Sequence, residues 1–324
     1  MHAVEPLIAV EDLAKRYGKR VALAGISFTV GPGEIVGLLG PNGAGKSTTL
    51  SIAATLLPAD RGTVTIAGRR LPGAAREVRR HLGFVPQQVA LYPALTATEN
   101  LRFFGRMQGL TARAAAEAAA RALALVALEG RAGEPVVRFS AGMRRRLNLA
   151  CGILHRPRVL LLDEPTVGID PQSRERIFDV AETLRREGAA ILYSTHYMEE
   201  AERLCGRVVL LDAGRVAAVG TPAELVGRTG MTQSIHLRTV RPLPPGWLAR
   251  TEGARIEGAR ILDGGGAETA IAVDDAAAVP TVLVSATRAG GEILELTLHR
   301  PNLADAFFML TGRALRDEDA APSA

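Results

Sequence analysis

The sequence predicts an α/β fold, in which helices cover a mostly parallel sheet, followed by a small C-terminal α+β domain. Apolar strand-like runs alternate with helix-like segments over roughly the first 220 residues, which is typical of a parallel sheet. A glycine-rich loop joins one such run to a helix at residues 40–47. Beyond residue 227 the pattern changes to short alternating strands. We therefore expect domains at residues 1–226 and 232–316, a linker at residues 227–232 and a disordered tail at residues 317–324.

The glycine-rich loop fits the phosphate-binding pattern GxxxxGK[ST], and its residues are Gly40, Pro41, Asn42, Gly43, Ala44, Gly45, Lys46 and Ser47. An apolar run at residues 35–39 precedes it, and residues 48–54 are compatible with a helix. Glycines let backbone N–H groups approach a phosphate, and the helix adds the positive end of its dipole. Lys46 is expected to reach the β- and γ-phosphates and Ser47 to ligate Mg²⁺. The alternative, a turn with a chance lysine, does not account for the flanking strand and helix.

Composition narrows the class of protein. Apolar residues make up 47% of the 324 residues, enough for a large core, and the two cysteines have neither disulfide-framework nor metal-ligand spacing. The sequence has no secretory leader and no run of about 18 apolar residues, so we do not expect the chain to enter a membrane by itself. The net charge is +5, and residues 101–158 hold eleven arginines against three acidic residues. That segment fits an anionic membrane surface, nucleic acid or a solvated helical face, but no aromatic ladder supports nucleic acid.

The N-terminal elements read as short strands at residues 7–10 and 26–30, split by a polar stretch at residues 11–19, with a further strand at residues 62–67. Tyr17 lies at a turn in the polar stretch, where its ring can stack on a base; a surface packing role is the alternative. A strand at residues 82–86 is followed directly by Gln87 and Gln88.

A helical subdomain is expected at about residues 88–157. Thr96 and Glu99 have capping-box spacing for a helix that starts near residue 100 and ends at residue 109. An alanine-rich helix at residues 111–128 follows. Ser140 caps another helix, which Pro157 closes.

The remaining sheet elements place polar residues at strand ends. Apolar strands at residues 159–162 and 189–193 lead into Asp163-Glu164 and Ser194-Thr195-His196, with an amphipathic helix at residues 173–186 between them. A helix at residues 197–205 and a strand at residues 208–211 follow. Ligands bind beyond the carboxyl ends of parallel strands, so Gly40, Asp163 and His196 are expected to share one site.

The C-terminal segment has its own pattern. Residues 234–240, 254–262, 268–273 and 292–298 alternate as strands, and residues 276–289 form a helix with Pro280 early in it. Asn302 caps a last helix that ends near Gly312.

The polar residues at the strand ends suit phosphoryl transfer to water. Asp163 is the expected second holder of Mg²⁺, with Ser47, and Glu164 is expected to polarise the attacking water. His196 can hydrogen-bond the γ-phosphate and the water, and the Gln87 amide can contact both Mg²⁺ and the water. Gln88 takes that role if the turn is offset by one residue. A plain pair of turn carboxylates is the alternative for Asp163 and Glu164.

A second anion site is expected at Ser140, Ala141 and Gly142. These small residues open a helix whose first backbone N–H groups have no partner within the helix.

The order of these stretches resembles the ATPase subunit of ABC transporters. The matching residues, which cover roughly residues 5–225, are Tyr17, Gly40 to Thr48, Gln87, Phe139 to Met143, Leu162 to Pro165, Gly168 to Asp170 and Ser194 to His196. Residues 166–171, residues 193–202 and, less specifically, residues 303–313 look like the branch that works with ABC-2 type permeases, including drug and daunorubicin-resistance exporters.

The resemblance implies a P-loop NTPase fold and a subunit that binds ATP and Mg²⁺ and hydrolyses ATP. By it, Tyr17 stacks on adenine, residues 40–48 bind the nucleotide, and Asp170 shapes an interface between two head-to-tail copies. Ser140, Ala141 and Gly142 then bind the γ-phosphate across that interface. A separate membrane permease is expected to dock at residues 87–107 on the cytoplasmic face of the membrane and to export a drug or lipid-like substrate. No nucleic-acid partner is expected.

One residue departs from the family pattern, which usually has glycine at position 141. Alanine costs about 1–2 kcal/mol if this position needs a left-handed backbone, and nothing if it is the first helical residue. We favour the second, because Ser140 makes a good cap.

Two rival functions share part of the pattern. A soluble ABC ATPase acting on ribosomes or DNA tends to carry two cassettes or a long coiled-coil insertion, and this chain has neither. A small-molecule kinase with the same loop leaves the Ser140 stretch and His196 without a role.

Overall fold

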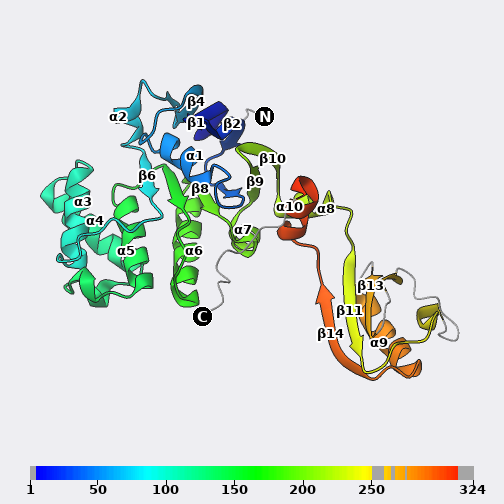
Figure 1. The fold of residues 1–324 in the computed structure, drawn as a ribbon. Helices are drawn as coiled ribbons and strands as arrows, with labels where there is room; N and C mark the ends of the chain where they lie inside the picture. Colours follow the sequence, from blue (N-terminus) through cyan, green and yellow to red (C-terminus); the bar gives the residue numbers. More distant parts are fainter. Residues whose placement is uncertain (1–4, 250–258, 264–266, 274–275, 313–324) are drawn as a thin grey trace. The chain divides into compact units, whose positions relative to one another are not determined.

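The computed structural model describes residues 5–249, 259–263, 267–273 and 276–312. The tail expected at residues 317–324, and residues 254–258 of one expected strand, lie outside these ranges. The chain divides into two compact units (Figure 1). One unit takes in the chain through Leu225 and again from Leu310, and the other spans Val226–Met309.

The first unit begins with an antiparallel sheet in the order β2-β1-β4-β5. Its strands are β1 (Ile8–Tyr17), β2 (Arg20–Val30), β4 (Arg61–Ile66) and β5 (Arg69–Arg70). The expectation of two short strands split by a polar stretch is wrong, because most of that stretch belongs to β1. Leu13 and Lys15 face inward there, and register shifts near Glu11 and Asp12 accommodate the polar residues as bulges.

A second sheet carries the parallel strands, in the order β10-β9-β3-β8-β7-β6. Its strands are β3 (Ile35–Leu39), β6 (Leu82–Val85), β7 (Val159–Asp163), β8 (Ala190–Thr195), β9 (Arg207–Asp212) and β10 (Arg215–Gly220). Every neighbouring pair is parallel except β10 with β9. All residues of β3, β7 and β8 are buried, which explains their unbroken apolar runs. The mostly parallel sheet is confirmed; the antiparallel strand β10 was not expected.

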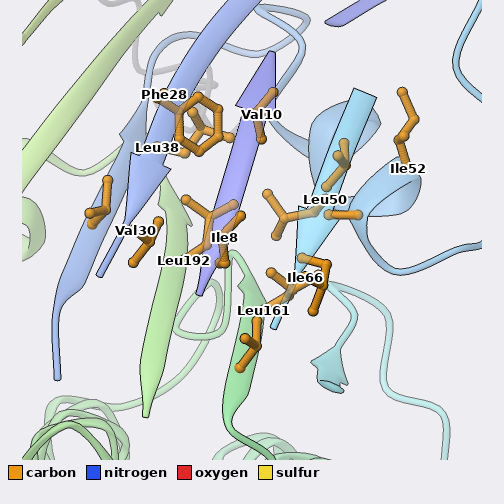
Figure 2. Close-up of a cluster of buried hydrophobic side chains, with 14 of the residues drawn as sticks. Ile8, Val10, Phe28, Val30, Leu38, Leu50, Ile52, Ile66, Leu161 and Leu192 are labelled. Atoms are coloured by element: carbon orange, nitrogen blue, oxygen red, sulfur yellow. The ribbon is translucent and has the colours of Figure 1, made fainter. Parts of the chain in front are cut away.

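The main core of the first unit lies between the two sheets (Figure 2). Ile8, Val10 and Phe28 of the antiparallel sheet pack in one cluster with Leu161 and Leu192 of the parallel sheet. Side chains of helix α1 (Lys46–Ala53) join this cluster, so the helix behind the glycine loop is anchored in the core.

Helices α3 (Ala97–Met107), α4 (Ala112–Leu125) and α5 (Ala141–Ile153) pack on one another beside β6 (Figure 1). The capping box at Thr96 and Glu99 is confirmed, and it starts the helix at Ala97 rather than near residue 100. The other helices of this unit are α2 (Ala75–Val78), α6 (Pro171–Arg186), α7 (Met198–Leu204) and α8 (Pro222–Gly227). Short 3-10 turns lie at Glu129–Arg131 and Val136–Arg138.

In its described residues, the second unit holds a four-stranded antiparallel sheet packed against helix α9 (Val279–Arg288). The strand order is β12-β13-β11-β14. Its elements are β11 (Gln233–Thr239), β12 (Ala259–Asp263), β13 (Glu268–Val273), β14 (Ile293–His299), α9 (Val279–Arg288) and short 3-10 turns at Trp247–Ala249 and Ala276–Ala278. Ile235, Trp247, Ile271 and Val282 form its core. The last helix, α10 (Leu303–Thr311), begins where the Asn302 side chain accepts hydrogen bonds from the backbone N–H groups of residues 304 and 305.

Across the described ranges, no helix has both the length and the hydropathy that a membrane span requires.

Candidate functional site

Three neighbouring strands deliver their carboxyl ends to the same edge of the parallel sheet. β8 lies between β3 and β7, with Leu39 opposite Thr195 and Asp163 opposite Ser194. The glycine loop follows β3, Glu164 follows β7, and His196 follows β8. The expected gathering of these segments is therefore what the strand order produces.

The glycine loop is packed tightly onto the start of β2. Helix α1 begins at Lys46 behind Gly45, whose φ of 110° is unfavourable for any other residue. A Cβ atom at position 45 would lie 2.6 Å from Leu23 Cδ2 and 2.7 Å from the Ala22 carbonyl oxygen. Position 43 also has a positive φ, of 82°. The loop conformation thus depends on glycine at both positions; the phosphate-loop pattern specifies Gly45, whereas Gly43 falls at a position that the pattern leaves open.

Lys46 folds back into this loop. Its Nζ donates to the carbonyl oxygens of Gly40 at 2.7 Å and Pro41 at 3.2 Å, and lies 3.2 Å from Glu164 Oε1. The Lys46 side chain is only 4% exposed. One buried cation therefore connects the loop after β3 to the carboxylate after β7.

The hairpin of β1 and β2 meets the loop through Arg20. A Cβ atom at Gly43 would lie 2.9 Å from Arg20 Nη2, so the guanidinium lies against the exposed side of the loop. Tyr17 is opposite Arg20 at the end of the hairpin and is half exposed. Sequence reasoning singled out Tyr17 and missed Arg20, a common turn arginine with no distinguishing pattern.

Asp163 binds the hydroxyl groups of two serines, one of them at the end of the glycine loop. Its Oδ1 accepts hydrogen bonds from Ser47 Oγ at 3.1 Å and Ser194 Oγ at 2.6 Å. Burial raises the pKa of the Asp163 carboxyl above its ordinary value, while the two serine hydrogen bonds act in the opposite direction. The sequence indicates only that Ser194 lies at a strand end; the register of β7 on β8 gives it this contact.

Glu164 is the centre of the site. Its backbone has a φ of 44°. Its N–H group donates to the backbone oxygen and to the hydroxyl oxygen of Ser194, each at 3.1 Å. Its Oε1 faces Lys46 Nζ and lies 3.3 Å from His196 Nδ1, without a well-directed hydrogen bond to the histidine. Its Oε2 accepts from Gln87 Nε2 at 3.1 Å. The carboxylate thus contacts three side chains that the sequence assigned to the same reaction.

Helix α5 holds the segment that carries Gln87. Arg145 Nη1 donates to the carbonyl oxygens of Pro86 and Gln87, and Asn148 Oδ1 accepts from the N–H group of Ala90. Arg145 is buried, and burial lowers its pKa, while Asp163 and Glu164 raise it. Within the arginine-rich segment at residues 101–158, Arg145 therefore does not belong to a solvated helical face. The hydrogen bond from Gln87 to Glu164 favours Gln87 over Gln88 as the glutamine of the site.

The Ser140 stretch forms the start of α5, apart from the network around Glu164. Ser140 Oγ accepts from the N–H group of Met143, and Ala141 is the first residue of the helix. A Cβ atom at Gly142 would overlap Ser173 Oγ and Asp170 Oδ2 at the start of α6. Alanine therefore fits at position 141, whereas position 142 requires glycine.

The donor set suits a hard divalent cation held together with phosphate oxygens. Among the described residues, no group of three or more His, Cys, Asp or Glu side chains could hold a metal ion. Ser47 and Asp163 supply one hydroxyl and one carboxylate within hydrogen-bond distance, which is the small oxygen set that Mg²⁺ uses beside a nucleotide. The residues present therefore fit Mg²⁺ bound with phosphates.

Known proteins resemble this chain in sequence. The family model described as "ABC transporter" matches residues 23–167. The chain is 41% identical over 316 residues to the linearmycin resistance ATP-binding protein LnrL of Bacillus subtilis, which covers 96% of this chain and 100% of that protein. It is 40% identical over 321 residues to the Nod factor export ATP-binding protein I of Ralstonia nicotianae, covering 96% of each chain.

Solved structures share the fold over about two thirds of the chain. An ATP-binding subunit of an ABC transporter superposes with a TM-score of 0.64 at 34% identity, over 69% of this chain and 93% of that one. The cbiO1 protein of Clostridium perfringens, described as part of the transporter complex cbiONQ, gives a TM-score of 0.63 at 26% identity, over 69% and 92% of the two chains.

Proposed function

The chain belongs to the ABC transporter family as an ATP-binding subunit, and from this premise we propose that it hydrolyses ATP to drive export through a separate membrane permease. The observation that carries the proposal is the contact of Glu164 with Lys46, Gln87 and His196 at the edge where the phosphate loop ends. These are the groups that position a triphosphate and a water for in-line attack.

In the proposed reaction, the loop at residues 40–48 and Lys46 hold the β- and γ-phosphates. Glu164 accepts a proton from water as that water attacks the γ-phosphorus, which gives ADP and phosphate. His196 and Gln87 orient the γ-phosphate and the water from either side of Glu164. The ring of Tyr17 stacks on the adenine. Arg20 lies beside Gly43 and adds a cation next to the loop.

Ser47, Asp163 and Gln87 are the proposed Mg²⁺ ligands. Bound Mg²⁺ neutralises charge on the phosphate oxygens. The chain's own part is to align Asp163 through the hydrogen bonds from Ser47 and Ser194, which also oppose the rise in its pKa that burial causes.

Two copies in head-to-tail contact would complete the site. Ser140, Ala141 and Gly142 open α5 with backbone N–H groups that suit an anion, and within one chain they lie outside the Glu164 network. We propose that they bind the γ-phosphate held by the other copy, and that Asp170, which caps α6 beside Gly142, lies at that interface.

The permease is proposed to dock on residues 87–107. An aromatic cluster is presented there: the ring centroids of Tyr92 and Phe103 are 4.9 Å apart, and those of Phe103 and Phe104 are 5.5 Å apart. Tyr92, Phe103 and Met107 are exposed. Such a patch is suited to an apolar segment of a partner protein. It would place the chain peripherally on the cytoplasmic face of the membrane.

Relatives named for linearmycin resistance and Nod factor export make a drug or lipid-like molecule the proposed class of substrate. We also propose that residues 1–226 form the ATP-binding domain, with a helical subdomain at about 88–157, and that residues 232–316 form an accessory domain.

The direct test is co-expression with any membrane protein that is encoded next to this gene. The proposal expects co-purification in detergent, ATPase activity in reconstituted membranes stimulated by the exported compound, and weaker co-purification of Phe103→Ser. Activity stimulated instead by ribosomes or by DNA, without membrane protein, would move the chain to the class of soluble ABC ATPases.

A further inference from the structure

Besides Asp163 and Glu164, the first unit buries a third carboxylate, that of Glu200. It belongs to α7, the helix that follows His196, and is only 3% exposed. Glu200 belongs neither to the phosphate loop nor to the proposed docking surface. A buried charge without polar partners is strongly destabilising, so polar groups must stabilise this carboxylate.

Three hydroxyl groups converge on one oxygen of Glu200. Its Oε2 accepts from Thr166 Oγ1 at 2.9 Å, from Tyr193 Oη at 2.9 Å and from Thr195 Oγ1 at 3.0 Å. All three residues are almost fully buried. Burial, and then the charge of Glu200, raises the pKa of the Tyr193 phenol, so this hydroxyl keeps its proton and donates.

The donors come from both segments that carry proposed catalytic side chains. Thr166 is two residues beyond Glu164, and Thr195 directly precedes His196. Thr195 Oγ1 also accepts from the N–H group of Tyr197, so the hydroxyl fixes the backbone on both sides of the histidine. Tyr193 ties the same carboxylate to the middle of β8.

The other oxygen of Glu200 faces α6. Arg174 Nε lies 3.6 Å from Glu200 Oε1, and neither atom has a hydrogen-bond partner among the described residues. Arg174 is in the first turn after Asp170, whose side chain caps the helix. The carboxylate therefore lies between the catalytic loops and the helix start at the proposed interface.

From this arrangement we propose that Glu200 is a positioning residue for ATP hydrolysis, which sets the spacing of Glu164 and His196 by binding Thr166 and Thr195 at once. The inference rests on the proposed ATPase function. Glu200 acts through geometry alone. Among the described residues, its carboxylate contacts Thr166, Tyr193, Thr195 and Arg174, but neither Glu164 nor His196. Displacement of a catalytic group by about 1 Å can lower a rate by about 100-fold.

The test compares steady-state ATP hydrolysis by the full chain with nucleotide affinity measured separately with a fluorescent ATP analogue. Glu200→Ala is expected to lower kcat by about 10- to 100-fold and to change the dissociation constant by less than about threefold. Glu200→Gln should recover part of the loss, since its amide oxygen still accepts from the hydroxyls. Thr195→Val removes one of the three donors but keeps a side chain of similar shape, and it replaces Glu200→Ala in the test if that variant does not fold. Thr195→Ser keeps the donor and should retain kcat.

A double-mutant cycle with His196→Ala separates positioning from a general structural role. If Glu200 acts by placing His196, then Glu200→Ala lowers kcat much less in the His196→Ala background than in the wild-type background. Equal fold-losses in the two backgrounds, or a Glu200→Ala kcat per bound nucleotide within threefold of wild type, overturn the inference. Glu164→Gln, run in parallel, tests the ATPase assignment itself: full activity in that variant would refute the proposed function, whereas its inactivity beside an active Glu200→Ala refutes only the positioning role.

Discussion

Lys46 Nζ lies 3.2 Å from Glu164 Oε1, and the two side chains are 4% and 6% exposed. The residue proposed to grip the phosphates and the residue proposed to prime the water thus neutralise each other. In the proposed reaction, a triphosphate that draws Lys46 toward itself would release Glu164 to accept a proton from water. The ion pair would then link binding of the triphosphate at the loop to activation of the base.

Glu164→Gln is expected to separate binding from turnover. The amide cannot take a proton from water, so the hydrolysis rate should fall by about 10²–10⁴-fold. Because the neutral side chain no longer holds Lys46, ATP affinity should equal or exceed that of the wild-type chain. Phosphate release and equilibrium binding of a labelled ATP analogue measure the two effects. A large loss of affinity in this variant would show that Lys46 and Glu164 do not compete in this way.

The same pair makes a prediction about stability. Lys46→Ala leaves a buried carboxylate without its cation, which should lower the free energy of unfolding by about 3 kcal/mol. Adding Glu164→Gln to that variant removes the uncompensated charge and should restore much of the loss. Urea denaturation of the two single variants and the double variant measures the coupling. Additive effects in this cycle would mean that the ion pair contributes nothing to the folded state.

Asp163 should make stability depend on pH in the direction opposite to most carboxylates. Burial raises the pKa of folded Asp163 above 3.8, the ordinary value that it has in the unfolded chain. At pH values between 3.8 and the raised pKa, the folded chain therefore binds more protons than the unfolded chain. The contribution of this group to stability therefore falls as pH rises through that window. Asp163→Asn keeps an acceptor for Ser47 and Ser194 but does not ionise.

Urea denaturation at a series of pH values measures this effect. The free energy of unfolding of Asp163→Asn, relative to wild type, should rise as pH increases from 3.8 through the raised pKa of folded Asp163 and then level off. As a control, Mg²⁺ with ATP should stabilise the wild-type chain and have little effect on the variant. A difference that is flat with pH, or that falls, would contradict the prediction.

Local patterns in the sequence were enough to place the strands that carry the site. The runs before Gly40, Asp163 and Ser194 are unbroken and apolar because their strands are buried on both faces. Parallel strands then bring their ends together whatever the details of packing. The cap at Ser140 was equally local, since it needs only the hydroxyl and the helix that follows.

Contacts between segments distant in sequence were not predictable in the same way. Most of residues 11–19 form a strand because bulges and a buried Lys15, paired with Asp60, absorb their polarity. Arg145 lies in a run of three arginines that looks solvated, yet its partners are carbonyl oxygens about 60 residues away. Likewise, Glu200 lies in an acidic helix start with no hint of the three hydroxyls that meet it.

The start of α5 gives a matched pair of substitutions one residue apart. Ala141 is already helical, so Ala141→Gly should lower stability by no more than about 1 kcal/mol and leave ATP hydrolysis within twofold of wild type. Gly142→Ala instead inserts a methyl group between α5 and the α6 start, where it would overlap Ser173 Oγ and Asp170 Oδ2. Relieving that overlap requires the two helix starts to move apart, at a cost of about 1–3 kcal/mol.

Because both helix starts lie at the proposed interface, Gly142→Ala should also weaken ATP-dependent dimerisation. Size-exclusion chromatography with ATP, in the Glu164→Gln background to prevent turnover, measures dimerisation, and urea denaturation measures stability. If Ala141→Gly instead strengthened the dimer, the backbone at position 141 would need a conformation other than helical, because glycine would relieve the strain that alanine has there. The tolerance of alanine in this stretch would then require a different explanation.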